Sequence, residues 1–130
     1  MKLKFRAWDK DRKYMEYTDE NLLVCFGGNG KVVLTDLSSV YSNCEGMENF
    51  ELMQSTGLKD INGTEIYEGD IVRYNRGISW SVEKFPYVVK NSLEGFVFEY
   101  GLIQHSLFLK IEYVTVIGNI YENPELLEGE

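Results

Sequence analysis

The sequence contains little cysteine, histidine or proline, with two Cys, one His and two Pro among 130 residues. A single histidine excludes metal sites and proton relays that need two imidazoles. Cys25 and Cys44 form no Cys-x-x-Cys pair. Two cysteines in a cytosolic chain usually stay reduced, although a disulfide between them is possible. Cys25 lies in the apolar run 22–26 and is predicted to be a small core residue, whereas Cys44 is predicted to be exposed.

Long apolar runs are also absent, since none approaches the roughly 18 residues of a membrane span. The N-terminus is basic but lacks the apolar stretch of a signal peptide. We therefore expect no membrane segment and a cytoplasmic location. A hydrophobic content of 44% excludes a wholly disordered chain, and the length fits one domain over residues 1–130.

Motifs of catalysis are missing as well. The chain has no phosphate-binding loop, no Gly-x-Gly-x-x-Gly run and no Gly-x-Ser-x-Gly elbow. A Cys–His nucleophilic pair would need Cys25 or Cys44 beside His105, and chance explains the presence of these three residues. We expect no catalytic residues and no cofactor, and hence a protein that is not an enzyme.

Charge is unevenly distributed along the chain. The net charge is −8, from 13 Lys and Arg against 21 Asp and Glu. Residues 1–13 carry +4, which leaves −12 on the rest, and four Glu lie in the last nine residues. The two ends could pair within one molecule or between subunits of an oligomer, or they could be solvated without a partner.

Short apolar runs with period two predict a series of β-strands. The first, over residues 2–8, alternates as a half-buried strand does and leads into a polar turn at 9–13. Further strands are predicted at 14–17, 22–26, 31–34, 50–54, 65–67, 71–74, 78–82, 87–89, 96–100 and 111–117. The run 111–117 is apolar on both faces, which predicts a central position in its sheet.

The connections between these strands contain Gly and Asn, which tolerate positive φ. Such turns are predicted at 27–30, 60–63, 69–70 and 75–77, and a loop at 36–49. A helical turn is predicted at 123–127, with Asn123 as N-cap and Pro124 at the first helical position. Residues 102–109 are the other helix candidate. The class is therefore mainly β, as a sandwich or a small barrel.

Three segments, 4–9, 52–72 and 117–127, together resemble the YopX family of phage and prophage proteins. The resemblance implies a low-GC Gram-positive host, an uncharacterised activity and an SH3-like small barrel with additional strands and hairpins. An aromatic residue is common in the family where Ser55 stands, and residues 14–50 match no part of it. The family-motif and turn residues are Trp8, Gly57, Asp60, Asn62, Gly63, Tyr67, Gly69, Asp70, Gly118, Asn119 and Pro124.

The pattern Asp60-x-Asn62-Gly63-x-Glu65 invites a calcium-site interpretation, because oxygen ligands at alternating positions suit a hard cation. An EF-hand loop needs an acidic ligand at its twelfth position, which is Ile71 here, and helices where this chain has predicted strands. We therefore interpret the segment as an Asn-Gly turn and predict no metal site. In the next turn, Gly69 allows the bend and Asp70 can accept from nearby backbone N–H groups.

Two functional hypotheses follow. The first is a non-enzymatic module that binds a host or phage protein, and in a narrower form it imitates nucleic acid. The second is a nucleic-acid-binding barrel, which requires Lys2, Lys4, Arg6 and Arg73 on one face. Bases are sparse beyond residue 13, so the 18 aromatic residues are expected to fill a core, and nucleic acid is not expected as a partner. Open β edges make a homo-oligomer possible.

Overall fold

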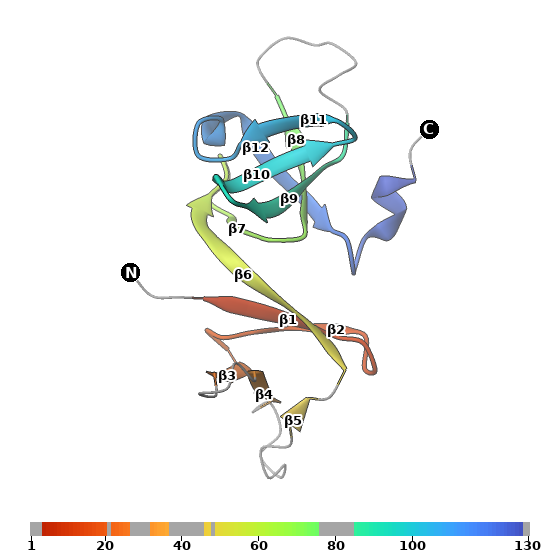
Figure 1. The fold of residues 1–130 in the computed structure, drawn as a ribbon. Helices are drawn as coiled ribbons and strands as arrows, with labels where there is room; N and C mark the ends of the chain where they lie inside the picture. Colours follow the sequence, from red (N-terminus) through yellow and green to blue (C-terminus); the bar gives the residue numbers. More distant parts are fainter. Residues whose placement is uncertain are drawn as a thin grey trace. The chain divides into compact units, whose positions relative to one another are not determined.

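The computed structural model describes residues 4–20, 22–26, 32–36, 46–47, 49–75 and 85–128. These residues are mainly β, as predicted, with two short 3-10 helices (Figure 1). The chain divides into two compact units, Met1–Gln54 and Ser55–Glu130, and strand β6 (Phe50–Lys59) contributes to both. The expectation of one domain over 1–130 stays a prediction. None of the described helices is long and apolar enough to cross a membrane.

In the first unit, β1 (Phe5–Asp9) pairs antiparallel with β2 (Tyr14–Tyr17) and with the first half of β6. The predicted polar turn between β1 and β2 is confirmed. The Asp9 carboxylate accepts from the backbone N–H groups of Asp11 and Arg12 at 3.0 and 3.1 Å. Lys13 closes the turn with φ +63°. The prediction that β1 is only half-buried is wrong in part, because Arg6 on its polar side is 3% exposed.

The remaining strands of this unit are β3 (Leu22–Phe26), β4 (Val32–Asp36) and β5 (Gly46–Met47). The predicted hairpin is confirmed, since β3 pairs antiparallel with β4. Strand β5 lies in the predicted loop 36–49 and pairs with β4. The turn 27–30 and Cys44 lie outside the described residues.

The core of the first unit corrects the prediction for Cys25. Ala7, Leu22 and Leu34 are buried together. Alternate residues of a strand point to opposite faces, so Leu22 turns inward while Leu23 turns outward. Cys25 is an odd-numbered residue of the same strand and shares the outward face with Leu23, and both are exposed. The apolar run was a half-buried strand and not a fully buried one.

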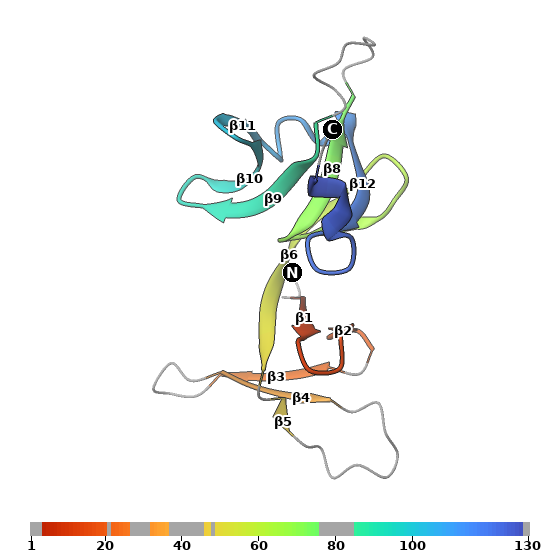
Figure 2. The ribbon, with the colours of Figure 1, turned by 90° about the vertical axis from the view of Figure 1, so that its right-hand side faces the viewer.

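The second unit holds a five-stranded antiparallel sheet in the order β11-β10-β9-β8-β12. Its strands are β8 (Asp70–Tyr74), β9 (Tyr87–Ser92), β10 (Gly95–Tyr100), β11 (Ile103–Ser106) and β12 (Val114–Asn119). Four strands form a meander, after which η2 (Ile111–Tyr113) returns the chain to the side of β8. The sheet curls into a half-barrel (Figure 2). The finer description, an SH3-like barrel, stays a prediction.

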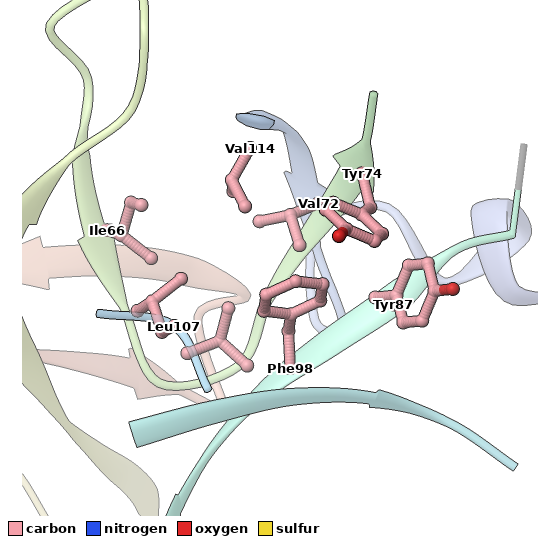
Figure 3. Packing of buried hydrophobic residues seen from close by; sticks show 8 residues of the cluster. Ile66, Val72, Tyr74, Tyr87, Phe98, Leu107 and Val114 are labelled. Carbon is pink, nitrogen blue, oxygen red and sulfur yellow. The ribbon is translucent and has the colours of Figure 1, made fainter. Parts of the chain in front are cut away.

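Side chains from the concave face of this sheet form the core of the second unit. Phe98, Val72 and Val114 are fully buried, and Leu107 and Ile66 close the cluster (Figure 3). Pairing explains the common face, because Val72 lies opposite Tyr87 and Val114 lies opposite Tyr74 in the register. Tyr74, Tyr87 and Phe98 thus confirm in part the expectation that aromatic residues fill a β core. Tyr100, Phe108 and Tyr113 are exposed instead.

The prediction for 111–117 is wrong in two respects. Residues 111–113 form η2, and β12 lies at an edge of the sheet and not at its centre. Its outer side is nevertheless bonded, because Ile61 N–H donates to the Val114 carbonyl at 3.4 Å and Val116 N–H donates to Asp60 Oδ2 at 2.9 Å. A turn bonded along this edge explains why the strand has the composition of a central one.

Residues 102–109 do not form the candidate helix. Gly101, with φ +60°, opens a two-residue turn between β10 and β11, and a Gly at this position is typical of a type II′ hairpin. Strand pairing with β10 overrides the weak helical pattern. The strand predicted at 78–82 and most of the turn 75–77 lie outside the described residues.

The C-terminal helical turn is confirmed as the 3-10 helix η3 (Pro124–Leu127), with Pro124 at its start. Asn123 stands at the N-cap position without capping the helix. Its Oδ1 accepts from the Asn119 backbone N–H at 3.1 Å, which ties η3 to the end of β12. A Cβ on Gly118 would lie 2.7 Å from that oxygen and 2.9 Å from Leu126 Cδ1. A larger residue at position 118 would therefore have to displace these two side chains.

We predict that Gly118→Ala lowers the free energy of unfolding by about 1–3 kcal/mol, since the added methyl must push Asn123 and η3 away from β12. Chemical denaturation measures the effect. Glu125→Ala, in η3 and exposed, is the control and should change stability by less than about 0.5 kcal/mol. Equal stability of the Gly118 variant and the wild type would contradict this packing.

Candidate functional site

The Asp60 carboxylate organises the turn between β6 and β7 (Glu65–Tyr67). Its Oδ1 accepts from the backbone N–H groups of Asn62 and Thr64, both at 2.9 Å. Its Oδ2 accepts from Val116 N–H, also at 2.9 Å, and the residue is only 6% exposed. Gly63 takes φ +84°, as the predicted Asn-Gly turn requires. One carboxylate therefore shapes the turn and attaches it to β12.

These bonds support the turn interpretation over the calcium one. Both Asp60 oxygens already accept from the backbone, so a cation would compete with those bonds. Glu65 accepts from the Ser55 hydroxyl through a short hydrogen bond. In the part of the chain that the structure describes, no three His, Cys, Asp or Glu side chains form a metal-binding group.

The Gly69-Asp70 turn has the roles that the sequence predicted. Gly69 takes φ +85°, donates its N–H to Val89 and accepts at its carbonyl from Ile120 N–H, at 2.9 and 3.0 Å. Asp70 is 2% exposed, and its Oδ2 accepts from Tyr67 N–H at 2.8 Å. The turn thus joins β7, β8 and β9 and also the segment that follows β12.

Asn119 forms a matching turn at the end of β12. Its Oδ1 accepts from the N–H groups of Tyr121 and Glu122 at 3.0 and 2.8 Å, and its Nδ2 donates to Glu122 Oε1 at 2.7 Å. Asn119 lies opposite Asp70 in the register of β12 and β8. The segments 52–72 and 117–127, which sequence reasoning treated separately, therefore meet in one place.

The other motif residues also have structural roles. Gly57, with φ +78°, lies where the register of β6 and β7 shifts between Ser55 and Lys59. Tyr67 is buried at 4% exposure. Trp8 belongs to the first unit, where it lies opposite Met15 and Glu51 in the strand register. The other motif residues belong to the second unit. Among the predicted residues, Asp60, Asp70 and Asn119 bind backbone N–H groups with their side-chain oxygens. Gly57, Gly63 and Gly69 supply positive φ.

A different segment presents apolar side chains to solvent. Five large hydrophobic residues within 100–109 are exposed, which we call the β11 apolar surface: Tyr100 at 40%, Leu102 at 105%, Ile103 at 40%, Phe108 at 71% and Leu109 at 71%. Ile103 is the first residue of β11, and the other four lie beyond its two ends. Sequence reasoning missed this surface, although residues 100–109 contain no Lys, Arg, Asp or Glu. That absence of charge was the available signal.

Aromatic rings pack beneath and beside this segment. His105 lies 4.7 Å from the ring of Tyr74 and 5.2 Å from that of Phe98, measured between centroids. Phe85 stacks on Tyr100 at 4.4 Å with an interplanar angle of 20°. Burial raises the pKa of the Tyr87 phenol above its ordinary value, and the neighbouring Tyr74 adds to the increase. The single histidine is therefore part of a ring cluster.

A comparison with protein families gives the same result as the three motif segments 4–9, 52–72 and 117–127. The model of the family described as YopX protein matches residues 4–128, nearly the whole chain. The chain belongs to the YopX family. The resemblance inferred from the three motif segments is therefore confirmed.

Two solved structures match over nearly all of both chains. The crystal structure of protein EF1440 from Enterococcus faecalis is 31% identical, with 98% of this chain and 99% of that chain covered and a TM-score of 0.58. Protein yopX from Bacillus subtilis is 25% identical, with 98% and 97% covered and a TM-score of 0.70. No curated protein matches.

We predict that Asp60→Ala lowers the free energy of unfolding by about 3 kcal/mol, because three backbone N–H groups lose a charged acceptor. Asp60→Asn keeps one oxygen and should lose about 1–2 kcal/mol, since its amide nitrogen cannot accept from Val116 if the oxygen stays with the turn. Thermal and urea denaturation measure both. Asn62→Ala, whose side chain is exposed, is the matched control, and a loss as large as that of Asp60→Ala would contradict the assignment.

The raised pKa of Tyr87 predicts a loss of stability in alkali. A phenol whose pKa is raised by folding stabilises the protein below the unfolded pKa of about 10, and this contribution is lost as the pH rises through the folded value. The unfolding free energy should fall as the pH rises above about 10, and less so in Tyr87→Phe. Tyr113→Phe, at an exposed ring, should retain the wild-type pH dependence. Identical profiles for all three proteins would refute the prediction.

Proposed function

We propose that this protein is a non-enzymatic module that binds another protein, and that the β11 apolar surface is the contact. The observation that supports this is the concentration of exposed apolar side chains on a stretch without formal charge. Burying a fully exposed leucine such as Leu102 against a partner contributes about 1.5–3 kcal/mol. Large apolar side chains gathered on a surface are typical of interaction sites.

The bonding of the polar motif residues supports the non-enzymatic part of the proposal. Asp60, Asp70 and Asn119 use their side-chain oxygens on backbone N–H groups. His105, the only histidine, lies among aromatic rings. A catalytic site needs polar groups that converge on a substrate, whereas the side chains of Asp60, Asp70 and Asn119 bind the protein's own backbone.

The setting is part of the same proposal. Family membership and the bacterial origin of the two solved relatives support an accessory protein encoded by a phage or prophage, acting in the bacterial cytoplasm. The meander of β8 to β11, the turn η2 and the return of β12 to β8 support an SH3-like arrangement of the second unit. Such folds host many functions, so the fold alone does not choose the partner.

The alternative, nucleic-acid binding through a basic face, finds little support. Arg6 is 3% exposed and so is withdrawn from any such face, and Lys2 lies outside the described residues. Lys10 pairs with Glu51, and Lys90 pairs with Glu99 at 2.8 Å. A net charge of −8 opposes a polyanion further.

A photo-crosslinking amino acid in place of Leu102 tests the proposed contact. We expect it to form a covalent adduct with a protein in bacterial cells, which mass spectrometry identifies. Leu93 is the matched control, because it is also a leucine in a β-turn, is 107% exposed and lies at the other end of β10. Adducts in equal yield from both positions, or from neither, would count against the β11 apolar surface.

A further inference from the structure

The backbone of β11 has an open edge that can be located residue by residue. Antiparallel pairs alternate between residues that exchange hydrogen bonds and residues that do not. The two-residue turn makes Tyr100 and Ile103 a bonded pair, and the bond from Leu107 N–H to the Phe96 carbonyl, at 3.0 Å, fits the same alternation. The backbone groups of Gln104 and Ser106 therefore point away from β10.

Among the described residues, only Ser106 uses one of these outward backbone groups in another hydrogen bond. The Ser106 carbonyl accepts from Lys110 N–H at 3.2 Å as the chain turns after β11. In the part of the chain that the structure describes, β11 pairs with β10 alone, so the Gln104 N–H and carbonyl face an unpaired edge. Such an edge is a template for another strand.

Charge limits which strand can be added. The chain carries −8, so two copies repel each other unless they meet where carboxylates are absent. Residues 100–109 hold no formal charge. The flanking Glu99 is held by Lys90 at 2.8 Å and by Gln104 Nε2 at 3.1 Å, and these bonds lower the pKa of its carboxyl below the ordinary value. A second copy can therefore approach β11 without opposing unpaired charges.

We propose that β11 of a second copy pairs antiparallel with this edge to form a two-fold symmetric dimer. The inference rests on the proposed function, because it names the protein that occupies the β11 apolar surface. The two-fold axis passes between the two Gln104 residues, which exchange their outward N–H and carbonyl groups. Ile103 of each copy then lies opposite His105 of the other. One segment serves both copies, as an isologous interface requires.

Salt dependence separates this dimer from an electrostatic one. Two chains of net charge −8 repel, and salt screens that repulsion, so pairing through the uncharged β11 should strengthen as ionic strength rises. Pairing between the basic residues 1–13 and an acidic C-terminus would weaken instead. Sedimentation velocity of the full chain over a concentration series, at low and high salt, distinguishes the two.

Two substitutions test the edge itself. Gln104→Pro removes an outward N–H and leaves the bonds to β10, since proline is tolerated on an edge strand whose N–H faces solvent. Leu102→Asp puts a charge on the uncharged segment. Each should raise the dimer dissociation constant at least about tenfold, equivalent to about 1.4 kcal/mol. Leu93→Asp should leave it unchanged, and circular dichroism with thermal melting checks that every variant is folded.

A disulfide reports the register. Gln104→Cys, in a chain with Cys25→Ser and Cys44→Ser, should oxidise to a covalent dimer, because paired residues in a bonded antiparallel pair have Cα atoms about 5.5 Å apart. Leu93→Cys in the same background should not. Ready oxidation of both variants, or of neither, would refute the register.

A monomer at both salt concentrations, or a dimer that Gln104→Pro does not weaken, would overturn the inference. A folded monomer whose position 102 still crosslinks to a different protein would overturn the dimer and leave the proposed function standing. If position 102 crosslinks to nothing and the protein is a monomer, both proposals fail.

Discussion

Three backbone N–H groups from two distant segments converge on the Asp60 carboxylate, and much of the second unit depends on that convergence. Burying a charge is costly unless hydrogen bonds replace its water, and three bonds at 2.9 Å do so here. Their effect reaches beyond the turn. The bond to Val116 covers one edge of the curled sheet, so β12 needs no further strand beside it.

The two edges of this sheet are therefore unlike. Along β12, the Asp60 turn donates from Ile61 and accepts from Val116, and the Asn119 turn fixes the end of the strand. Along β11, the described residues supply no such cover, and the flanking side chains are apolar and exposed. An edge strand of this kind invites pairing unless charge or a bulge protects it. The Asp60 turn closes the β12 edge, and among the described residues no comparable turn is bonded along β11, where we propose that association occurs.

The sequence was informative where structure is decided locally. The turns at 60–63 and 69–70 follow from Gly63 and Gly69, whose positive φ is a local requirement, and the hairpins follow from the turns. The wrong predictions concern strands whose position and burial depend on residues far away in the sequence. Nothing near residues 111–117 reveals that β12 is an edge strand bonded to Asp60, and nothing near Cys25 reveals that its strand is covered on one face only. Periodicity predicts where strands form, but it does not identify which segments pair with them.

The candidate site escaped sequence reasoning for a related reason. Motif residues attract attention because their types are unusual, but in this chain those types solve problems of backbone geometry, and Gly118 beside Asn123 is a case in point. The β11 apolar surface consists of ordinary residues whose importance depends on exposure, which a sequence does not state. Its one visible sign was the lack of charge across 100–109 in an acidic chain. A stretch that avoids the protein's dominant charge is suited to meeting another surface, because contact there removes apolar area from water without opposing like charges.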